Sequence, residues 1–235
     1  MNEDGGGSFW DHLAELRRRL LRILAVFGAG LVLAYVVSPR LLSFLARPVG
    51  SLYFFAPAEA FLVRLKVAAL AALLATLPYH HWEMWQFLKP ALLPRERRPA
   101  RLFWWTALLL FYLGAAFALF LGIPVGLRVL LSFGGPDLQA LLRAGDYVNF
   151  ALLLVLAFGG LFEFPLLVVA LTLLGLLDPA VLARHRREVI VGVFVVAAVI
   201  TPSVDFVTQT LLALPLIILF EVGLWISRRF QRRST

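Results

Sequence analysis

The sequence has no cysteine, which excludes disulfides, thiol catalysis and cysteine-ligated metal sites. It also lacks common enzyme motifs: no glycine-rich phosphate loop ends in Lys-Ser or Lys-Thr, and no Gly-x-Ser-x-Gly or His-Glu-x-x-His segment is present. The adjacent His80 and His81 point in different directions on a helix, so they do not suit one metal ion. We therefore expect no enzyme activity, no cofactor and no metal site.

Charged residues are also scarce, at 15% of the chain, whereas 61% of its residues are hydrophobic. A soluble domain of 235 residues cannot bury that much apolar surface, so the composition predicts a polytopic membrane protein. The bilayer core offers no water to backbone groups, and the spans are therefore expected to be helices. The predicted fold class is all-α.

The hydrophobic residues gather in six apolar segments, most of which are followed by a proline. The segments are Leu20–Val37, Glu59–Leu77, Leu102–Ile123, Val148–Leu177, Val189–Thr201 and Phe206–Ile226. They predict one membrane domain of six transmembrane helices over residues 1–235. Within it we expect an N-terminal cytoplasmic segment over 1–19, a first cytoplasmic loop over 79–101 and a cytoplasmic tail over 227–235.

Most of the 22 Lys and Arg residues lie on one set of flanks of these segments. They are Arg17, Arg18, Arg19, Arg22, Lys89, Arg95, Arg97, Arg98, Arg101, Arg184, Arg186, Arg187, Arg228, Arg229, Arg232 and Arg233. The positive-inside rule places these flanks, and both termini, in the cytoplasm. The net charge of +8 is thus explained by topology and lipid headgroups, and no nucleic-acid partner is expected.

The last two helices are expected to be short. Val189–Thr201 has 13 residues and spans about 20 Å, and the strictly apolar part of the last segment, Leu211–Phe220, has 10 residues. A hydrocarbon core of about 30 Å is not matched by either helix. We expect the bilayer to thin locally or the helices to lie in a shielded groove; the alternative is that tilted neighbours and flanking aromatic residues cover the mismatch.

Small residues recur every four positions in the third segment, at Gly114, Ala118 and Gly122. Small residues on one face of a helix allow another helix to approach closely. The pattern favours packing inside the protein over a homodimer face.

Glu163 is the only ionisable residue of Val148–Leu177 and lies near its midpoint. An acid at the centre of a bilayer costs about 2.5–3.5 kcal/mol, so such a residue is typically functional and faces a protein interior or a wet cavity. The alternative is a structural group bonded to a neighbouring helix. Gly159-Gly160 and Pro165 flank the carboxylate, and they predict a bend in the backbone beside it.

Two other acids lie in strongly basic stretches at the expected membrane interface. Glu15 precedes Arg17-Arg18-Arg19, and Glu96 lies among the arginines that follow Phe87. Glu15 and Arg19 are spaced to form a local surface ion pair. The functional alternative is that these acids receive guanidinium groups from another molecule, since a carboxylate accepts arginine in a two-pronged geometry that lysine cannot reproduce.

Taken together, five motifs in order give the chain a resemblance to TatC, the multispanning receptor subunit of the twin-arginine protein translocase. They are His12–Leu20; Pro57–Phe61 with Lys66; Trp85–Phe87 followed by Pro90–Leu92 and Glu96–Arg98; Phe158-Gly159 with Phe162–Leu166; and Thr201-Pro202, Asp205, Gln209, Pro215 and Phe220-Glu221. The resemblance covers nearly the whole chain. It implies a cupped six-helix protein of the bacterial inner membrane that exports folded proteins with the proton motive force.

The resemblance also implies roles for particular residues. Glu96 would be the main acceptor for the paired arginines of signal peptides, with Glu15, Arg17 and Phe87 shaping the same surface. Glu163 would be the membrane-embedded acid of the concave face. Gln209 would contact single-span partner subunits of the TatA and TatB type or, equally, bond within its own bundle. Structural or partner-contact roles would fall to the residues Pro48, Pro165 and Asp205, and the chain is expected to form a homo-oligomer within a multisubunit complex.

Two other classes of function compete with a translocase. A proton-coupled small-molecule secondary transporter would also use an intramembrane acid and broken helices. No clear inverted repeat is present, however, and a lone acid offers little to a substrate with several polar groups. A structural assembly scaffold is the third class. Flux through vesicles that contain this protein alone would favour the transporter, whereas dependence of export on partner subunits would favour the translocase.

Overall fold

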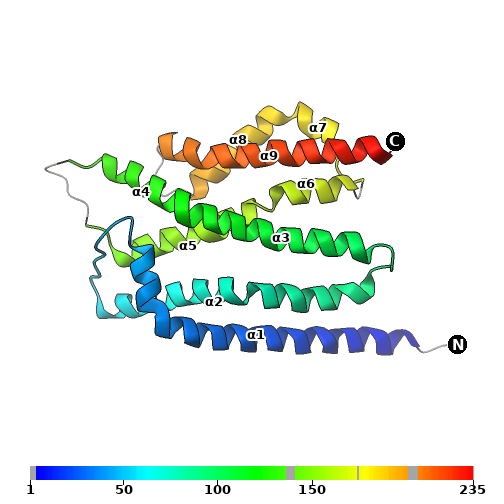
Figure 1. The fold of residues 1–235 in the computed structure, drawn as a ribbon, viewed down its shortest axis with the longest axis horizontal. Coiled ribbons are helices and arrows are strands. Elements are labelled where there is room, and N and C mark those ends of the chain that lie inside the picture. Colours follow the sequence, from blue (N-terminus) through cyan, green and yellow to red (C-terminus); the bar gives the residue numbers. More distant parts are fainter. Residues whose placement is uncertain (1–3, 136–140, 174, 201–205, 235) are drawn as a thin grey trace. The chain divides into compact units, whose positions relative to one another are not determined.

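The computed structural model describes residues 4–135, 141–173, 175–200 and 206–234, and these are mostly helical (Figure 1). The α-helices are α1 (Asp4–Leu45), α2 (Pro57–Leu88), α3 (Arg97–Phe117), α4 (Ile123–Ser132), α5 (Ala144–Leu161), α6 (Phe164–Leu173), α7 (Pro179–Arg184), α8 (Arg186–Ile200) and α9 (Phe206–Ser234). A short 3-10 turn, η1 (Lys89–Ala91), follows α2, and a π-helical turn, η2 (Ala118–Gly122), joins α3 to α4. The all-α fold class is confirmed.

Within the described residues, four helical stretches are long and apolar enough to cross a membrane: Trp10–Leu45, Pro57–Ala91, Arg97–Ser132 and Ala144–Leu173. They confirm a multi-pass membrane protein, while the count of six spans stays a prediction. Helix α8, with 15 residues, is short as predicted. Helix α9 has 29 residues, so the last helix is not short and that prediction is wrong. Only its strictly apolar part, Leu211–Phe220, is short.

Three predicted helix ends at prolines are wrong; the segment predicted to end at Ile123, before Pro124, continues as helix to Ser132. Pro39 lies inside α1, which continues to Leu45, and Pro78 lies inside α2, which continues to Leu88. Residues 79–88 of the predicted loop over 79–101 are therefore helical. Proline removes a single helix hydrogen bond, and a helix can continue past it when the freed carbonyl finds another donor.

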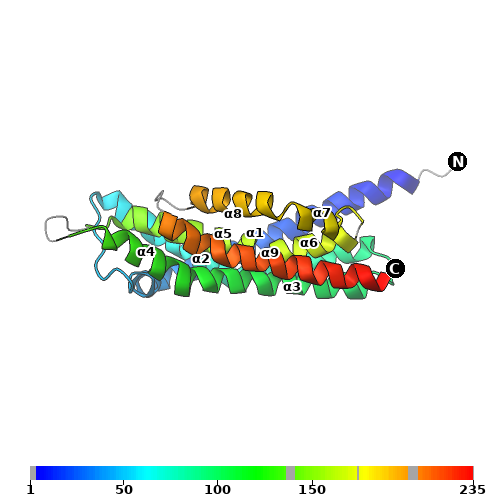
Figure 2. The same cartoon turned by 90° about the horizontal axis from the view of Figure 1, so that it is seen from above.

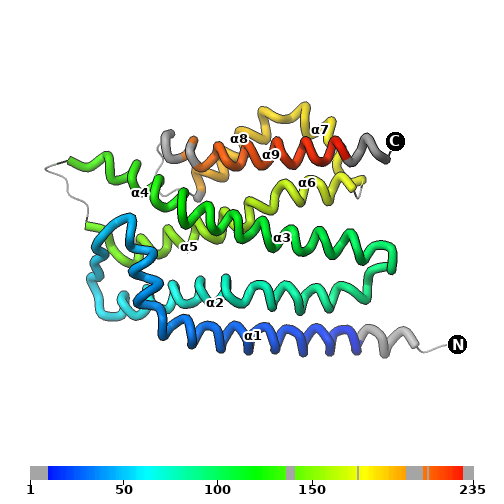
Figure 3. The backbone as a smooth tube through the Cα atoms, in the orientation of Figure 1, coloured from blue at the N-terminus to red at the C-terminus, as the bar shows by residue number. Residues whose placement is uncertain are grey.

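The structure shows that compensation at Pro39. The Ser38 hydroxyl donates to the carbonyl oxygen of Tyr35, which a proline four residues later cannot bond, at 2.7 Å. The Arg64 side chain of α2 donates from Nε to the same hydroxyl at 3.1 Å, and its guanidinium lies over the Tyr35 ring. Helix α1 bends near its C-terminal end (Figure 3). A polar contact between helices thus stabilises the bend.

The chain divides into two compact units, described separately below. The N-terminal unit comprises Met1–Phe44 and Ala56–Leu108, and the C-terminal unit comprises Leu45–Phe55 and Leu109–Thr235. In the N-terminal unit, α1 runs beside α2 (Figure 1) over a core of small residues, Ala34, Ala68 and Ala72. A methyl group added at Gly30 would lie 2.9 Å from the Thr76 side chain, so the two backbones approach closely.

In the C-terminal unit, α9 packs along α6 and α8, and Figure 2 shows α8 and α9 side by side. A Cβ atom on Gly223 would lie 2.7 Å from the Cα of Pro165 at the start of α6. Only glycine allows this approach. Pro165 is thereby buried in helix packing, and the structural or partner-contact role expected for it stays a prediction.

Helices α3 and α5 meet just as closely in the same unit. Gly114 faces the backbone of Phe158, whose carbonyl carbon would lie 2.7 Å from an added Cβ. Ala118 and Gly122 are both buried. The small residues at spacing four therefore pack inside the protein, as predicted, rather than forming an exposed face.

Candidate functional site

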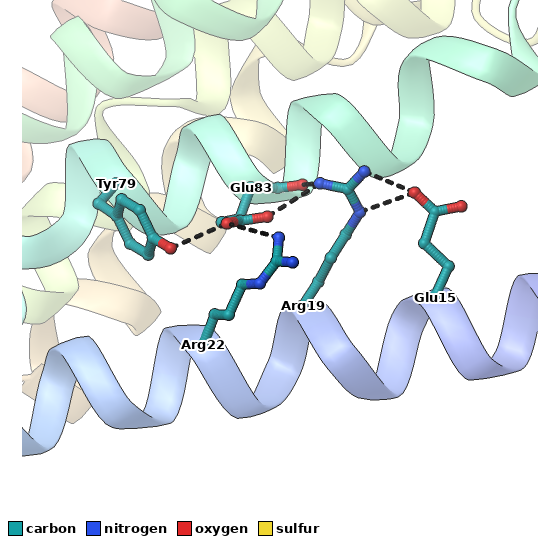
Figure 4. Close-up of polar contacts among 5 residues, drawn as sticks. All are labelled: Glu15, Arg19, Arg22, Tyr79 and Glu83. Atoms are coloured by element: carbon teal, nitrogen blue, oxygen red, sulfur yellow. Dashed lines mark hydrogen bonds and ion pairs between the residues drawn. The ribbon is translucent and has the colours of Figure 1, made fainter.

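Arg19 on α1 bonds to two carboxylates at once (Figure 4). Its Nε donates to Oε1 of Glu15 at 3.0 Å, and its Nη1 donates to Oε2 of Glu83 on α2 at 2.9 Å. Its Nη2 also donates to Oε1 of Glu15, at 2.5 Å. Both bonds to Glu15 thus end on one oxygen, and among the described residues no group donates to the other, Oε2.

Glu83 is buried, with 1% of the residue exposed. The Tyr79 hydroxyl donates to its Oε1 at 2.8 Å, and Nη1 of Arg22 lies 3.7 Å from the same oxygen. Removing a carboxylate from water is costly unless cations and hydrogen-bond donors surround it. These contacts meet that requirement, so the charged groups hold α1 and α2 in register. We call Glu15, Arg19, Arg22, Tyr79 and Glu83 the Arg19 cluster.

The sequence predicts only part of the Arg19 cluster. The local pair of Glu15 and Arg19 is confirmed. The sequence does not single out Glu83, because Glu83 follows Pro78 and falls within the loop predicted over 79–101. Its spacing of four from Tyr79 was the available local signal, but nothing in the sequence identifies an arginine 64 residues away as its partner.

Aromatic stacking joins the same two helices near the N-terminus of the chain. The His12 ring on α1 stacks on Phe87 of α2, with centroids 4.3 Å apart and planes at 24°. His12 lies one helical turn before Glu15 on α1, and Phe87 one turn after Glu83 on α2. The predicted residues Glu15 and Phe87 are therefore brought to one end of the α1–α2 pair. Arg17 is exposed on α1.

Glu96 is exposed in the turn that precedes α3. Its Oε2 accepts a hydrogen bond from the backbone N–H of Leu93 at 3.2 Å, and its carbonyl oxygen accepts one from Ala100 at 3.0 Å. The Nε of neighbouring Arg97 donates instead to the carbonyl oxygen of Leu92, at 3.2 Å. In the part of the chain that the structure describes, no cation forms an ion pair with Glu96. Its carboxylate is thus held in place, with Oε1 open to a further donor.

Glu163 lies at the break between α5 and α6, which end and begin at Leu161 and Phe164. The predicted bend beside this carboxylate is confirmed. Its side chain is half-buried, and among the described residues it has no hydrogen-bond or ion-pair partner. An apolar pocket of about 280 Å³ lies beside the break, lined by Leu161, Phe164, Val189, Val193, Val196 and Leu216.

Gln209 lies near the start of α9 and is half-buried. Its Nε2 donates to the carbonyl oxygen of Phe194 on α8 at 2.7 Å. The internal bond that the sequence left open is therefore present. Asp205, predicted to have a structural or partner-contact role, lies outside the described residues.

Pro48 is exposed in the turn after α1. It lines an open cavity of about 630 Å³ together with Arg47, Pro124 and Arg128. The adjoining segment is fixed in the C-terminal unit, because Tyr53 exchanges backbone hydrogen bonds with Leu142 and Ala144 at 3.0 and 2.7 Å.

Comparison with known proteins points to one family. The family model of the Sec-independent protein translocase protein (TatC) matches residues 11–215. The TatC protein of Frankia casuarinae is 37% identical over 99% of this chain and 70% of its own length. The TatC protein of Halothiobacillus neapolitanus is 36% identical over 99% of this chain and 65% of its own length. The TatC protein of Carboxydothermus hydrogenoformans is 32% identical over 96% of this chain and 95% of its own length. The chain thus spans about two thirds of the length of the first two relatives.

Solved structures agree with this result. A crystal structure of the twin-arginine translocase receptor TatC superposes with a TM-score of 0.75 at 33% identity, covering 92% of this chain and 98% of that one. A second crystal structure of the receptor, in the detergent DDM, gives a TM-score of 0.76 at 32% identity. Sequence and fold agree over almost the whole chain, and the chain therefore belongs to the TatC family of Sec-independent protein translocase proteins.

Proposed function

We propose that this protein is the signal-peptide receptor and core membrane subunit of a twin-arginine translocase, which exports folded proteins with the proton motive force. The family match over residues 11–215 is the observation that carries the proposal. The structure supports it with accessible carboxylates on the N-terminal unit, where the paired arginines of a signal peptide would bind. A small-molecule transporter has no comparable support.

Glu96 is proposed as the main acceptor for a signal arginine. Its carboxylate is exposed, one oxygen is anchored by the N–H of Leu93, and one of the two flanking arginines, Arg97, bonds to the Leu92 carbonyl instead. An anchored carboxylate with an open oxygen loses little side-chain entropy when it accepts a guanidinium. Lysine would bind less well, because a single ammonium group cannot make the parallel bonds of an arginine fork.

Glu15 is proposed as the second acceptor. Its side chain is 32% exposed, and the bonds from Arg19 engage only its Oε1. The neighbouring stack of His12 on Phe87 fixes the end of the α1–α2 pair and supplies an aromatic surface beside it. Arg17, exposed on the same helix, would help to shape the same surface.

After capture, the apolar part of the signal is proposed to move into the membrane near Glu163. The apolar pocket beside the α5–α6 break offers a surface for it, and a half-buried acid without a partner lowers the cost of inserting polar backbone there. The same region, with the short α8, is the proposed contact for single-span partners of the TatA and TatB type. The bacterial inner membrane, with both termini in the cytoplasm, is the proposed location.

Binding of a fluorescent twin-arginine signal peptide to the purified full-length protein in lipid nanodiscs tests the first step. We expect Glu96→Gln to weaken binding about tenfold, the value of one hydrogen bond between charged groups. Replacing both signal arginines by lysine should weaken binding at least as much. Glu188→Gln, which removes an exposed acid at the start of α8, is the matched control and should bind like the wild type.

Two results would contradict the proposal: unchanged binding of the two-lysine peptide to the wild type, or unchanged binding of the twin-arginine peptide to the Glu96→Gln protein. Export of a folded reporter in cells that carry the same variants then tests whether binding limits transport.

A further inference from the structure

Glu83 is a buried acid that an incoming peptide does not reach, because only 2% of its side chain is exposed. It nevertheless bonds to the same guanidinium as Glu15, whose side chain is 32% exposed. Arg19 therefore connects a buried carboxylate to an accessible one (Figure 4). A change at Glu83 can reach the accessible carboxylate through this single side chain.

The positive charge of Arg19 is shared between these two acids. Nη1 is committed to Glu83, while Nε and Nη2 are committed to one oxygen of Glu15. One cation and two anions leave the three groups with one net negative charge. Without the charge of Glu83, Arg19 and Glu15 would form a neutral pair, which attracts a second guanidinium only weakly.

Other nearby cations change this balance less. Nη1 of Arg22 lies 3.7 Å from Glu83, and its side chain is 61% exposed, so water and salt screen its charge. His12 and Arg18 also act on Glu15 electrostatically, but both residues are exposed to solvent, which screens them. Arg19, with 16% of its side chain exposed, is the least screened of these cations.

We infer that Glu83 is a positioning residue for signal recognition: it holds the charge of Arg19 away from Glu15 and so leaves Oε2 of Glu15 negative and open to a signal arginine. Tyr79 contributes by occupying Oε1 of Glu83, which leaves Oε2 for Arg19. The inference rests on the proposed function and deepens it, because Glu83 sets affinity for the signal without touching it.

The peptide-binding assay in nanodiscs tests the inference with Glu83→Gln, which keeps the size of the side chain and one acceptor oxygen but removes the charge. Affinity for the twin-arginine peptide should fall about fivefold to tenfold, the difference between a charge-assisted and a neutral hydrogen bond. Affinity for the two-lysine peptide should change much less. Glu221→Gln, which removes the acid of another arginine pair, at 3.0 Å from Arg186, should have no effect.

A double variant separates positioning from a purely structural role. Arg19→Gln combined with Glu83→Gln removes both members of the buried pair and leaves Glu15 with the same net negative charge as the native cluster. Its affinity for the twin-arginine peptide should therefore return to within about twofold of the wild type. This rescue is readable even if the Glu83→Gln protein fails to fold, because the double variant leaves no unpaired buried charge.

The inference is overturned if Glu83→Gln binds like the wild type, if it weakens binding of the two peptides equally, or if the double variant remains as weak as or weaker than Glu83→Gln. Glu15→Gln and Glu96→Gln distinguish this failure from failure of the proposed function. If neither of them weakens binding, the proposed function fails and the inference with it. If they weaken binding and Glu83→Gln does not, only the inference fails.

Discussion

Glu83 is buried on α2 and Glu163 is half-buried at the break between α5 and α6, and the surroundings of the two acids differ. Glu83 accepts hydrogen bonds from Arg19 and Tyr79 and lies near Arg22. Glu163, at the α5–α6 break, has no such partner among the described residues. Glu83 therefore helps to hold α1 and α2 together, whereas the side chain of Glu163 makes no bond to a neighbouring helix among the described residues.

The two regions are correspondingly stabilised in different ways. Charged groups join α1 to α2 around Glu83, whereas the helices around Glu163 are joined by glycines that allow backbones to touch. Gly114 faces the backbone of Phe158, and Gly223 faces that of Pro165. A polar residue without a packing role in a membrane helix is free to serve function, which fits the role proposed for Glu163.

The largest effect is expected from Gly114→Ala, which tests whether close packing holds the Glu163 region. The new methyl would collide with backbone atoms of Phe158, which cannot rotate away. We expect a loss of about 3 kcal/mol in unfolding free energy, at the upper end of overpacking costs. Unfolding in mixed detergent micelles measures it. Gly160→Ala is the control, since nothing lies within 4 Å of its Cβ; equal stability of the two variants would contradict the prediction.

Glu83→Ala should have the next largest effect, because it removes both carboxylate oxygens that accept from Arg19 and Tyr79 and leaves Arg19 only the Glu83 backbone carbonyl, at 3.4 Å. Breaking a buried ion pair costs about 3–5 kcal/mol, and we expect about 2 kcal/mol here because Arg19 retains Glu15. The same unfolding assay measures the loss. A wild-type unfolding curve would show that the Arg19 cluster does not join α1 to α2.

Glu163→Gln should change the unfolding free energy only slightly, and it should raise it, whereas the two variants above lower it. Replacing an unpartnered acid at membrane depth by a neutral isostere should raise the unfolding free energy by up to about 1 kcal/mol. Export of a folded reporter should nevertheless fall if the carboxylate is functional. A clear loss of stability would show that Glu163 has a structural bond like that of Glu83, and the comparison would fail.

The smallest effect is expected from Gln209→Leu. The side chain makes one bond to the Phe194 carbonyl, and hydrogen bonds between membrane helices average about 0.6 kcal/mol. Unfolding should shift by about that amount. Crosslinking of a single-span partner to α9 is the second measurement. If crosslinking falls while stability changes only by this amount, Gln209 contacts a partner as well as α8. If crosslinking is unchanged, Gln209 serves only the bond to Phe194.

Much of the fold could be predicted from the sequence, because a bilayer constrains which apolar segments can cross it and requires them to be helical. Long apolar runs must be helical and must span, and the short α8 follows from counting residues. The helix ends were predicted less well, because Pro39 and Pro78 have the same local signature as terminating prolines. Whether a helix continues past a proline depends on a donor for the freed carbonyl; at Pro39 this donor is the adjacent Ser38 hydroxyl, which Arg64 of α2 holds in place.

The accessible part of the candidate site was also readable from the sequence. Glu15 and Glu96 attract attention as acids in basic stretches, and Glu163 as an acid in an apolar one. Glu83 does not, because its neighbours in sequence, Trp82 and Met84, are uncharged and its burial is created by packing against α1. The bond of Gln209 to Phe194 was one of two open alternatives until the spacing of α8 and α9 was known.

The sequence by itself determined that this chain is helical and crosses membranes, and its motifs indicated the family, since hydrophobicity and short motifs are local properties. Only the tertiary structure decided which acids are neutralised and which are open. Arg19 could pair with Glu15 alone from its spacing, but the approach of α2 adds Glu83 and divides the charge. Electrostatic interactions act through space between residues far apart in the chain, and no local pattern encodes that distance.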